Sequence, residues 1–118
     1  MVFPREMTVD SFAGFPVRNY TMALEWYQRL FGCPAAFLPN DIEAVFELAE
    51  HRYAFIKVLP DDAGHAFNLF FLSDLEKVVA EIADRGIVPA TRETLEGGVI
   101  RIIYKDPDGN EVGFGGKI

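Results

Sequence analysis

Two stretches of the chain carry apolar residues at helical spacing. The first covers 20–31, with Asn19 in position to cap its start and Gly32 directly after it. The second covers 73–85, where Ser73 and Glu76 have the spacing of a capping box. Gly86 follows this second stretch and can adopt the left-handed conformation that ends many helices. The pattern therefore predicts helices over 20–31 and 73–85.

The remaining apolar stretches are short and rich in residues that favour strands. We expect strands over 8–17, 43–49, 53–59, 66–72, 99–105 and 111–114, with weaker signals over 35–37 and 88–91. The stretches 43–49 and 53–59 flank a short polar segment, which predicts a hairpin. Asp106-Pro107-Asp108-Gly109 has proline second and glycine fourth, as in a type I turn.

The order of these elements repeats itself along the chain. A shift of 55 residues lays Phe12 on Phe67 and Pro34 on Pro89, so an internal duplication is the main structural prediction. We expect one domain over 1–118, with module one at about 8–59, a polar linker at 60–65 and module two at about 66–115. Neither half has enough apolar residues for a core of its own, so two modules must pair, within the chain or across a dimer.

Composition narrows the function classes. Half of the 118 residues are apolar and a quarter are charged, which is typical of a soluble globular protein. The apolar runs fall short of a membrane span, and the first ten residues lack a signal-peptide pattern. A single cysteine, Cys33, excludes an internal disulfide and suits the cytoplasm, where we expect the protein to reside.

The net charge of −7 argues against a nucleic-acid partner, because the few lysines and arginines are scattered rather than clustered. The acidic excess favours a cationic small molecule, or it serves only solubility.

Three motifs in order resemble one family of proteins. They are the strand end at 17–19 with the helix ending at 26–32, the start of module two at 72–75, and the sequence Asp-Pro-Asp-Gly-Asn-Glu-Val at 106–112. Together they resemble the vicinal-oxygen-chelate superfamily, which includes glyoxalase I, extradiol dioxygenases and the fosfomycin- and bleomycin-resistance proteins. The resemblance implies an α+β fold in which two βαβββ modules form a cupped mixed sheet with helices on the outer face. It also implies a homodimer.

The catalytic members of this superfamily hold a divalent metal inside the cup. The resemblance places the four ligand positions at Phe12, at or near Lys57, at Phe67 and at Gly113. Phenylalanine, glycine and protonated lysine offer no lone pair to a metal. The resemblance therefore implies a protein that binds no metal and needs no cofactor.

Apolar surface replaces the metal ligands in this interpretation. Strand alternation places a group of largely aromatic residues on the cup face, where a flat organic ligand would lie. The predicted ligand-binding residues are Phe12, Tyr53, Phe55, Lys57, Phe67, Phe71, Arg101 and Ile103. Lys57 and Arg101 would orient a polar group of the ligand. Alternatively, the aromatic side chains close the cup on themselves.

Three functions remain open at this point. The first is a small-molecule binding protein without a metal, similar to the drug-sequestering bleomycin-resistance type, with no catalytic residues. The second is an enzyme of the same family with a displaced metal site or with acid–base residues such as Glu47 or Glu111. The third is a scaffold or regulatory subunit with a filled cup. The residue types at the ligand positions favour the first.

Overall fold

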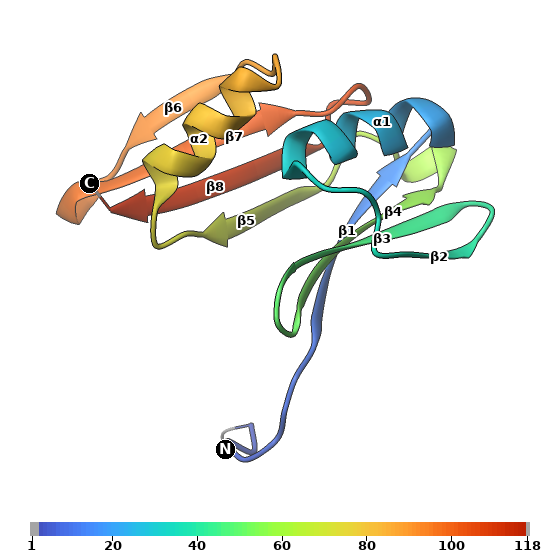
Figure 1. Ribbon diagram of the computed structural model, residues 1–118, viewed down its shortest axis with the longest axis horizontal. Coiled ribbons are helices and arrows are strands. Elements are labelled where there is room, and N and C mark those ends of the chain that lie inside the picture. The colour runs from blue at the N-terminus through green and yellow to red at the C-terminus, as the bar shows by residue number, and fades with distance from the viewer. Residues whose placement is uncertain (1–2, 118) are drawn as a thin grey trace.

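Each half of the chain folds into the same βαβββ unit in the computed structural model, which describes residues 3–117 (Figure 1). Module one contains β1 (Ser11–Val17), α1 (Tyr20–Phe31), β2 (Phe37–Asn40), β3 (Glu43–Ala49) and β4 (Arg52–Val58). Module two contains β5 (Phe67–Phe71), α2 (Leu75–Asp84), β6 (Thr91–Thr94), β7 (Val99–Lys105) and β8 (Glu111–Lys117). Short 3-10 turns lie at Pro60–Asp62 and Glu96–Gly98.

The two sheets have the same strand order, β1-β4-β3-β2 and β5-β8-β7-β6. The first strand of each module pairs in parallel with the last, and the other pairs are antiparallel. This shared topology confirms the α+β fold of two βαβββ modules.

Side-chain caps mark the start of both helices, and a glycine ends the first. Asn19 Oδ1 accepts a hydrogen bond from the Met22 amide at 2.9 Å, and Gly32 ends α1 with a φ of 72°. The capping box predicted from Ser73 is wrong by one residue, because Asp74 is the N-cap and accepts from the Lys77 amide. A carboxylate serves a cap as well as a hydroxyl does, so the spacing from Ser73 misled the prediction.

Several strand ends depart from the prediction: the strand expected at 35–37 lies at Phe37–Asn40, and the strands expected at 53–59 and 66–72 each shift by one residue at both ends. Residues 8–10 belong to an arm that extends away from the body (Figure 1) instead of to β1. The strand expected at 88–91 lies at Thr91–Thr94, where it pairs with β7. The last strand continues past 114 to Lys117, because Ile100 of β7 pairs with Gly116. Gly116 also has to be small, since a Cβ there would lie 2.8 Å from Leu75 Cβ.

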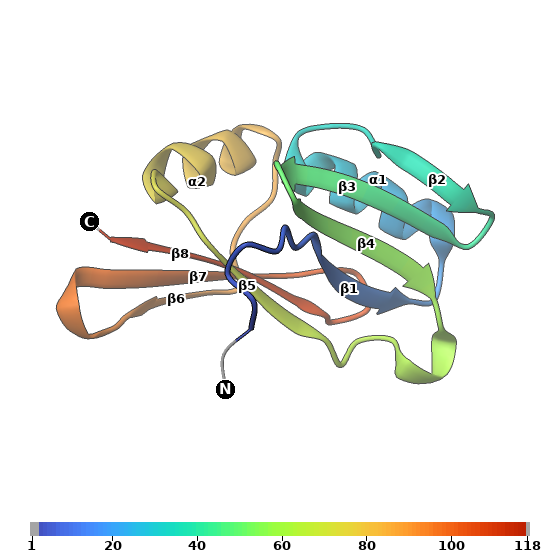
Figure 2. The ribbon, with the colours of Figure 1, turned by 90° about the horizontal axis from the view of Figure 1, so that it is seen from below.

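A single apolar core joins the two modules on the helix side of the sheets. Phe15, Tyr27 and Phe46 of module one and Ile82, Ile102 and Phe114 of module two belong to it. The C-terminal ends of α1 and α2 also contact each other, since Arg29 and Arg85 each donate to a main-chain carbonyl of the other helix. Figure 2 shows the two helices on the same side of the molecule. Within residues 3–117, neither helix has the length or apolar character to cross a bilayer.

Candidate functional site

The sheet faces that point away from the helices are largely apolar and exposed. Side chains alternate along β1, so Phe15 is buried against the helices whereas Phe12 is 50% exposed. The same alternation leaves Phe67 50% and Phe71 63% exposed on β5. We call these surfaces the module-one face, on β1–β4, and the module-two face, on β5–β8.

All the predicted ligand-binding residues lie on these faces, but they divide between two sheets. Phe12, Tyr53, Phe55 and Lys57 lie on the module-one face; Phe67, Phe71, Arg101 and Ile103 lie on the module-two face. A cavity of about 730 Å³ brings Phe12, Tyr53 and Phe71 together, and the other five residues do not line it. Within one chain, the structure therefore assembles part of the predicted site.

Aromatic rings on both faces pack against each other or against glycines of the neighbouring strand. The Phe12 and Tyr53 rings stack, with centroids 4.7 Å apart and planes 11° from parallel. The Phe55 ring covers Gly14, where a Cβ would come within 2.7 Å of the ring. Phe67 and Phe71 contact Gly113 and Gly115 in the same way. Larger residues at these glycines would push the rings off the sheet.

Arg101 is not a free cation on the module-two face. Its Nη2 donates to Glu93 Oε2 at 2.9 Å, and its guanidinium lies 5.9 Å from the centre of the Phe67 ring. The Nε of Arg101 is buried and has no hydrogen-bond partner within residues 3–117. Lys57 on the module-one face lies directly across from Glu43.

The two sheet faces do not share the excess of acidic residues found in the chain as a whole. The strand registers place four acids and four bases on them: Glu43, Glu47, Glu93 and Glu111 against Lys57, Arg101, Lys105 and Lys117. The faces are thus balanced in charge, and the net charge of −7 arises elsewhere in the chain. This favours the solubility interpretation of that charge over attraction of a cationic ligand.

The strand registers also locate the positions of the expected metal ligands. Gly14 pairs with Phe55, and Leu69 pairs with Gly113. Because Gly14 and Leu69 each lie two residues after the first ligand position of their module, Phe55 is the counterpart of Gly113. The metal-ligand position expected at or near Lys57 is therefore Phe55. Its side chain has no donor atom for a metal either.

Other possible metal ligands do not form a site elsewhere within residues 3–117. No group of three or more His, Cys, Asp or Glu residues within 3–117 is arranged to hold an ion. The two carboxylates considered for acid–base chemistry, Glu47 and Glu111, lie on different sheets. The residues present therefore do not fit the metal that the fold family implies.

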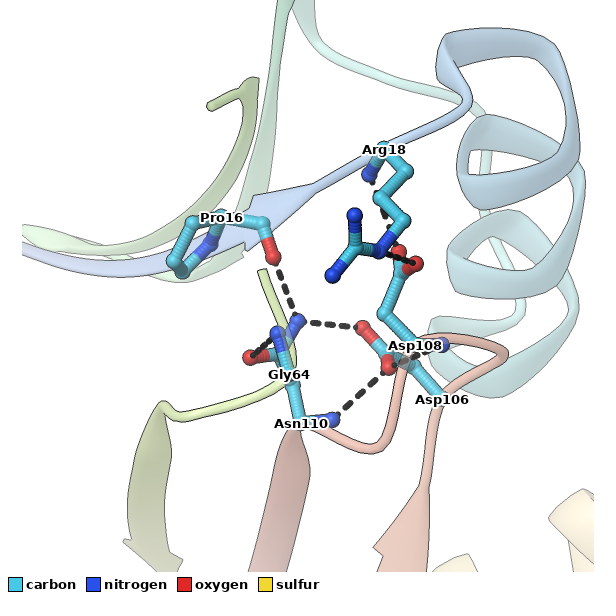
Figure 3. A network of polar contacts seen from close by, with 6 residues as sticks. All are labelled: Pro16, Arg18, Gly64, Asp106, Asp108 and Asn110. Carbon is cyan, nitrogen blue, oxygen red and sulfur yellow. Dashed lines mark hydrogen bonds and ion pairs between the residues drawn. The ribbon is translucent and has the colours of Figure 1, made fainter. Parts of the chain in front are cut away.

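A buried polar network joins the modules at one end of their junction (Figure 3). Asn110, fully buried, accepts at Oδ1 from the amides of Gly64 and Ala66, and donates from Nδ2 to the Pro16 carbonyl at 2.7 Å. Asn110 Nδ2 also donates to Asp106 Oδ2 at 2.8 Å. These bonds connect the linker, β1 and the turn before β8.

Asp106 extends this network into α1. The Tyr27 hydroxyl donates to Asp106 Oδ2 at 2.7 Å, and burial together with this carboxylate raises the pKa of Tyr27. Sequence reasoning identified the segment 106–110 as a turn, and the bond from the Gly109 amide to the Asp106 carbonyl confirms the turn. It missed the side-chain bonds between modules, for which the only sequence signal is an aspartate and an asparagine flanking the turn.

The cavity lies at the other end of the module junction. Apolar residues of both modules line its helix side, and polar residues lie among the rest of its lining. The apolar set is Leu30, Phe31, Leu48, Phe70, Leu72, Val78 and Phe114, and the polar set includes Arg52, Asn68, Glu81 and Arg85.

Comparison with solved structures identifies several relatives in fold. A glyoxalase/bleomycin resistance protein from Catenulispora acidiphila is 38% identical, with a TM-score of 0.89, over 94% of this chain and 100% of that chain. A bleomycin-binding protein complexed with bleomycin is 19% identical, with a TM-score of 0.76, over 94% and 100% of the two chains. Lactoylglutathione lyase from Agrobacterium tumefaciens is 15% identical, with a TM-score of 0.71, over 96% and 95%.

The last two relatives, at such low identity, show the fold alone. A search of the curated proteins gave no match. The family model named Glyoxalase/Bleomycin resistance protein/Dioxygenase superfamily matches residues 8–114, nearly the whole chain. With this match, the duplicated βαβββ topology and the 38% identical relative, the chain belongs to the Glyoxalase/Bleomycin resistance protein/Dioxygenase superfamily.

Proposed function

We propose that the protein binds a flat organic molecule, without a metal, against the aromatic side chains of its two sheet faces. The observation that carries this proposal is the exposure of Phe12, Phe67 and Phe71, each at least half exposed on a face that no helix covers. Burial of such rings against a flat ligand excludes water from both surfaces. The bleomycin-binding protein supports the proposal, because it shows that a protein of this fold can bind an organic molecule.

The ligand class follows from the charges on the faces. Acids and bases on the faces are equal in number, and Arg101 is already paired with Glu93. A buried ion of the ligand would therefore find no free partner at Arg101, and burial without a partner is costly. We infer a ligand that is aromatic and largely uncharged.

We further propose that two copies of the chain close the cup. The module-one and module-two faces divide the predicted residues between them, so a second copy would complete each site by placing its own module-two face over the module-one face. The exposed apolar residues on both faces support this, because a monomer rarely leaves so many in contact with water. Light scattering is expected to give twice the chain mass of 13.2 kDa. A measured mass equal to that of one chain, with the protein at tens of micromolar, would argue against the dimer.

The binding proposal is tested with Phe67→Ala. A panel of flat aromatic compounds is screened by thermal shift, and the compounds that bind are titrated by calorimetry. Loss of one aromatic wall is expected to weaken binding by about 1–3 kcal/mol, the scale of an interface anchor. The matched control is Met22→Ala, which removes a side chain of similar exposure, 54%, from α1 on the opposite side. The proposal fails if every bound compound keeps its affinity in Phe67→Ala.

A further inference from the structure

The facing edges of β1 and β5 are not joined by a backbone ladder. The Ser11 amide donates to the His51 carbonyl and the Val17 carbonyl accepts from Leu59, so the odd positions of β1 bond towards β4. Peptide groups alternate in direction along a strand, so those of Phe12 and Gly14 point the other way, towards β5. No backbone hydrogen bond joins β1 to β5 in the described part of the chain.

The edge of β5 mirrors this arrangement. The Leu72 amide donates to Gly115 and the Ala66 carbonyl accepts from Glu111, so the even positions bond towards β8. The peptide groups of Leu69 and Phe71 therefore point towards β1. Main-chain donors and acceptors without backbone partners thus face each other across the junction, where each must find a partner in a side chain, in water or in a ligand.

Side-chain amides supply the missing bonds at one end of the junction only. Asn68 Nδ2 donates to the Gly14 carbonyl at 3.0 Å, and Asn110 Nδ2 donates to the Pro16 carbonyl at 2.7 Å. Towards Phe12 and Phe71 no such side chain bridges the edges among the described residues. The cavity begins there, and its lining includes 11–13 of β1 and 68–72 across β5 and its end.

The cavity is apolar on both sides of these two edges. Phe12, Tyr53, Leu69 and Phe71 lie on the side of the sheet faces, and Leu30, Phe31, Phe70 and Val78 lie on the side of the helices. Its volume of about 730 Å³ lies within the usual range for a small-molecule site. Of the charged residues in its lining, Arg52 and Arg85 oppose Glu81, so little net charge favours an ionic ligand.

We propose that this junction cavity binds an extended peptide or peptide-like molecule with apolar side groups. An extended amide backbone placed between the edges pairs with the free peptide groups of Phe12, Leu69 and Phe71. Its side groups alternate between the two apolar walls, as in any strand added to a sheet. This site overlaps the proposed aromatic site at Phe12, Tyr53 and Phe71, but it is distinguished from that site because Phe55 and Phe67 do not line the cavity.

The first test compares two probes on the full chain. The probe is N-acetyl-Val-Phe-Val amide, and its twin carries methyl groups on the backbone nitrogens, which remove the donors but keep the apolar surface. Calorimetry is expected to show the twin binding at least about tenfold more weakly. Amide hydrogen exchange at Phe12 and Leu69 is expected to slow when the first peptide binds. Equal affinity of the two peptides, or exchange that does not change, would overturn the proposal.

The second test blocks the cavity from the helix side. Val78 and Val79 are neighbours on α2, both are half-buried, and only Val78 lines the cavity. We expect Val78→Trp to weaken peptide binding about tenfold or more, while Val79→Trp stays within about twofold. Equal effects of the two variants would contradict the site.

Two further variants separate this site from its alternatives. Phe67→Ala is expected to weaken binding of the aromatic ligand but to leave peptide binding unchanged. The two proposals can therefore fail independently of each other. Met7→Asp changes an exposed residue of the arm, 57% exposed, and is expected to leave peptide binding unchanged. If the peptide binds only to Met7→Asp, the arm of a second copy fills the cavity and the proposal is overturned.

Discussion

Replacement of Asn110 by alanine is expected to destabilise the protein strongly. The change removes four side-chain hydrogen bonds, to Gly64, Ala66, Pro16 and Asp106. At about 0.5–1.5 kcal/mol net for each bond, the loss is about 2–6 kcal/mol. Because Asn110 is fully buried and its partners stay behind without replacements, we expect about 3–5 kcal/mol. The total free energy of unfolding of a domain of this size is roughly 5–15 kcal/mol.

The measurement is equilibrium unfolding in urea, followed by circular dichroism and by Trp26 fluorescence. Asn68→Ala is the matched control, since its amide makes a single bond across the same junction, to the Gly14 carbonyl. This control is expected to cost about 0.5–1.5 kcal/mol. If Asn110→Ala costs less than about 1 kcal/mol, the network does not hold the modules together and the reasoning is wrong.

Three other outcomes follow from the structure. Tyr27→Phe removes one of the two side-chain donors to the buried Asp106 Oδ2, leaving Asn110 as the other, and should lower the free energy of unfolding by about 1–3 kcal/mol, measured by urea titration. Gly14→Ala places a Cβ within 2.7 Å of the Phe55 ring and should cost about 1–3 kcal/mol by the same assay. Burial raises the pKa of the Cys33 thiol, which leaves less thiolate at neutral pH, so iodoacetamide should modify Cys33 more slowly in the folded chain than in urea, and equal rates would contradict this.

The elements could be predicted because their signals are local. Residues 20–31 form α1 as predicted, and β3 and β7 have the predicted bounds, since periodicity and flanking turns fix them. The end of β8 could not be predicted, because its glycines favour no strand and only pairing with β7 orders them. The duplication was predictable from sequence because it repeats apolar positions, which both modules need for the same packing.

The candidate site was predictable only one face at a time. Alternation along β1 and β5 correctly placed Phe12, Phe67 and Phe71 away from the helices. How the two faces lie relative to each other depends on contacts between distant segments, such as Asn110 with Pro16, 94 positions apart. No local pattern encodes such contacts, so neither the divided site nor the cavity could be predicted.

Gly113, which lies next to the Phe67 ring, limits how this protein could acquire a metal ligand at that position. A side chain at position 113 would begin with a Cβ 3.0 Å from the ends of Ile103 and Leu69 and 3.3 Å from the Phe67 ring. A glutamate introduced there by mutation would have to displace these groups, and Phe12, Phe55 and Phe67 would still offer no lone pair. A metal site at these four positions therefore needs more than one substitution, so selection on a single substitution has nothing to act upon. Sequences derived from this one can diversify by reshaping an apolar surface far more readily than by acquiring a metal at these positions.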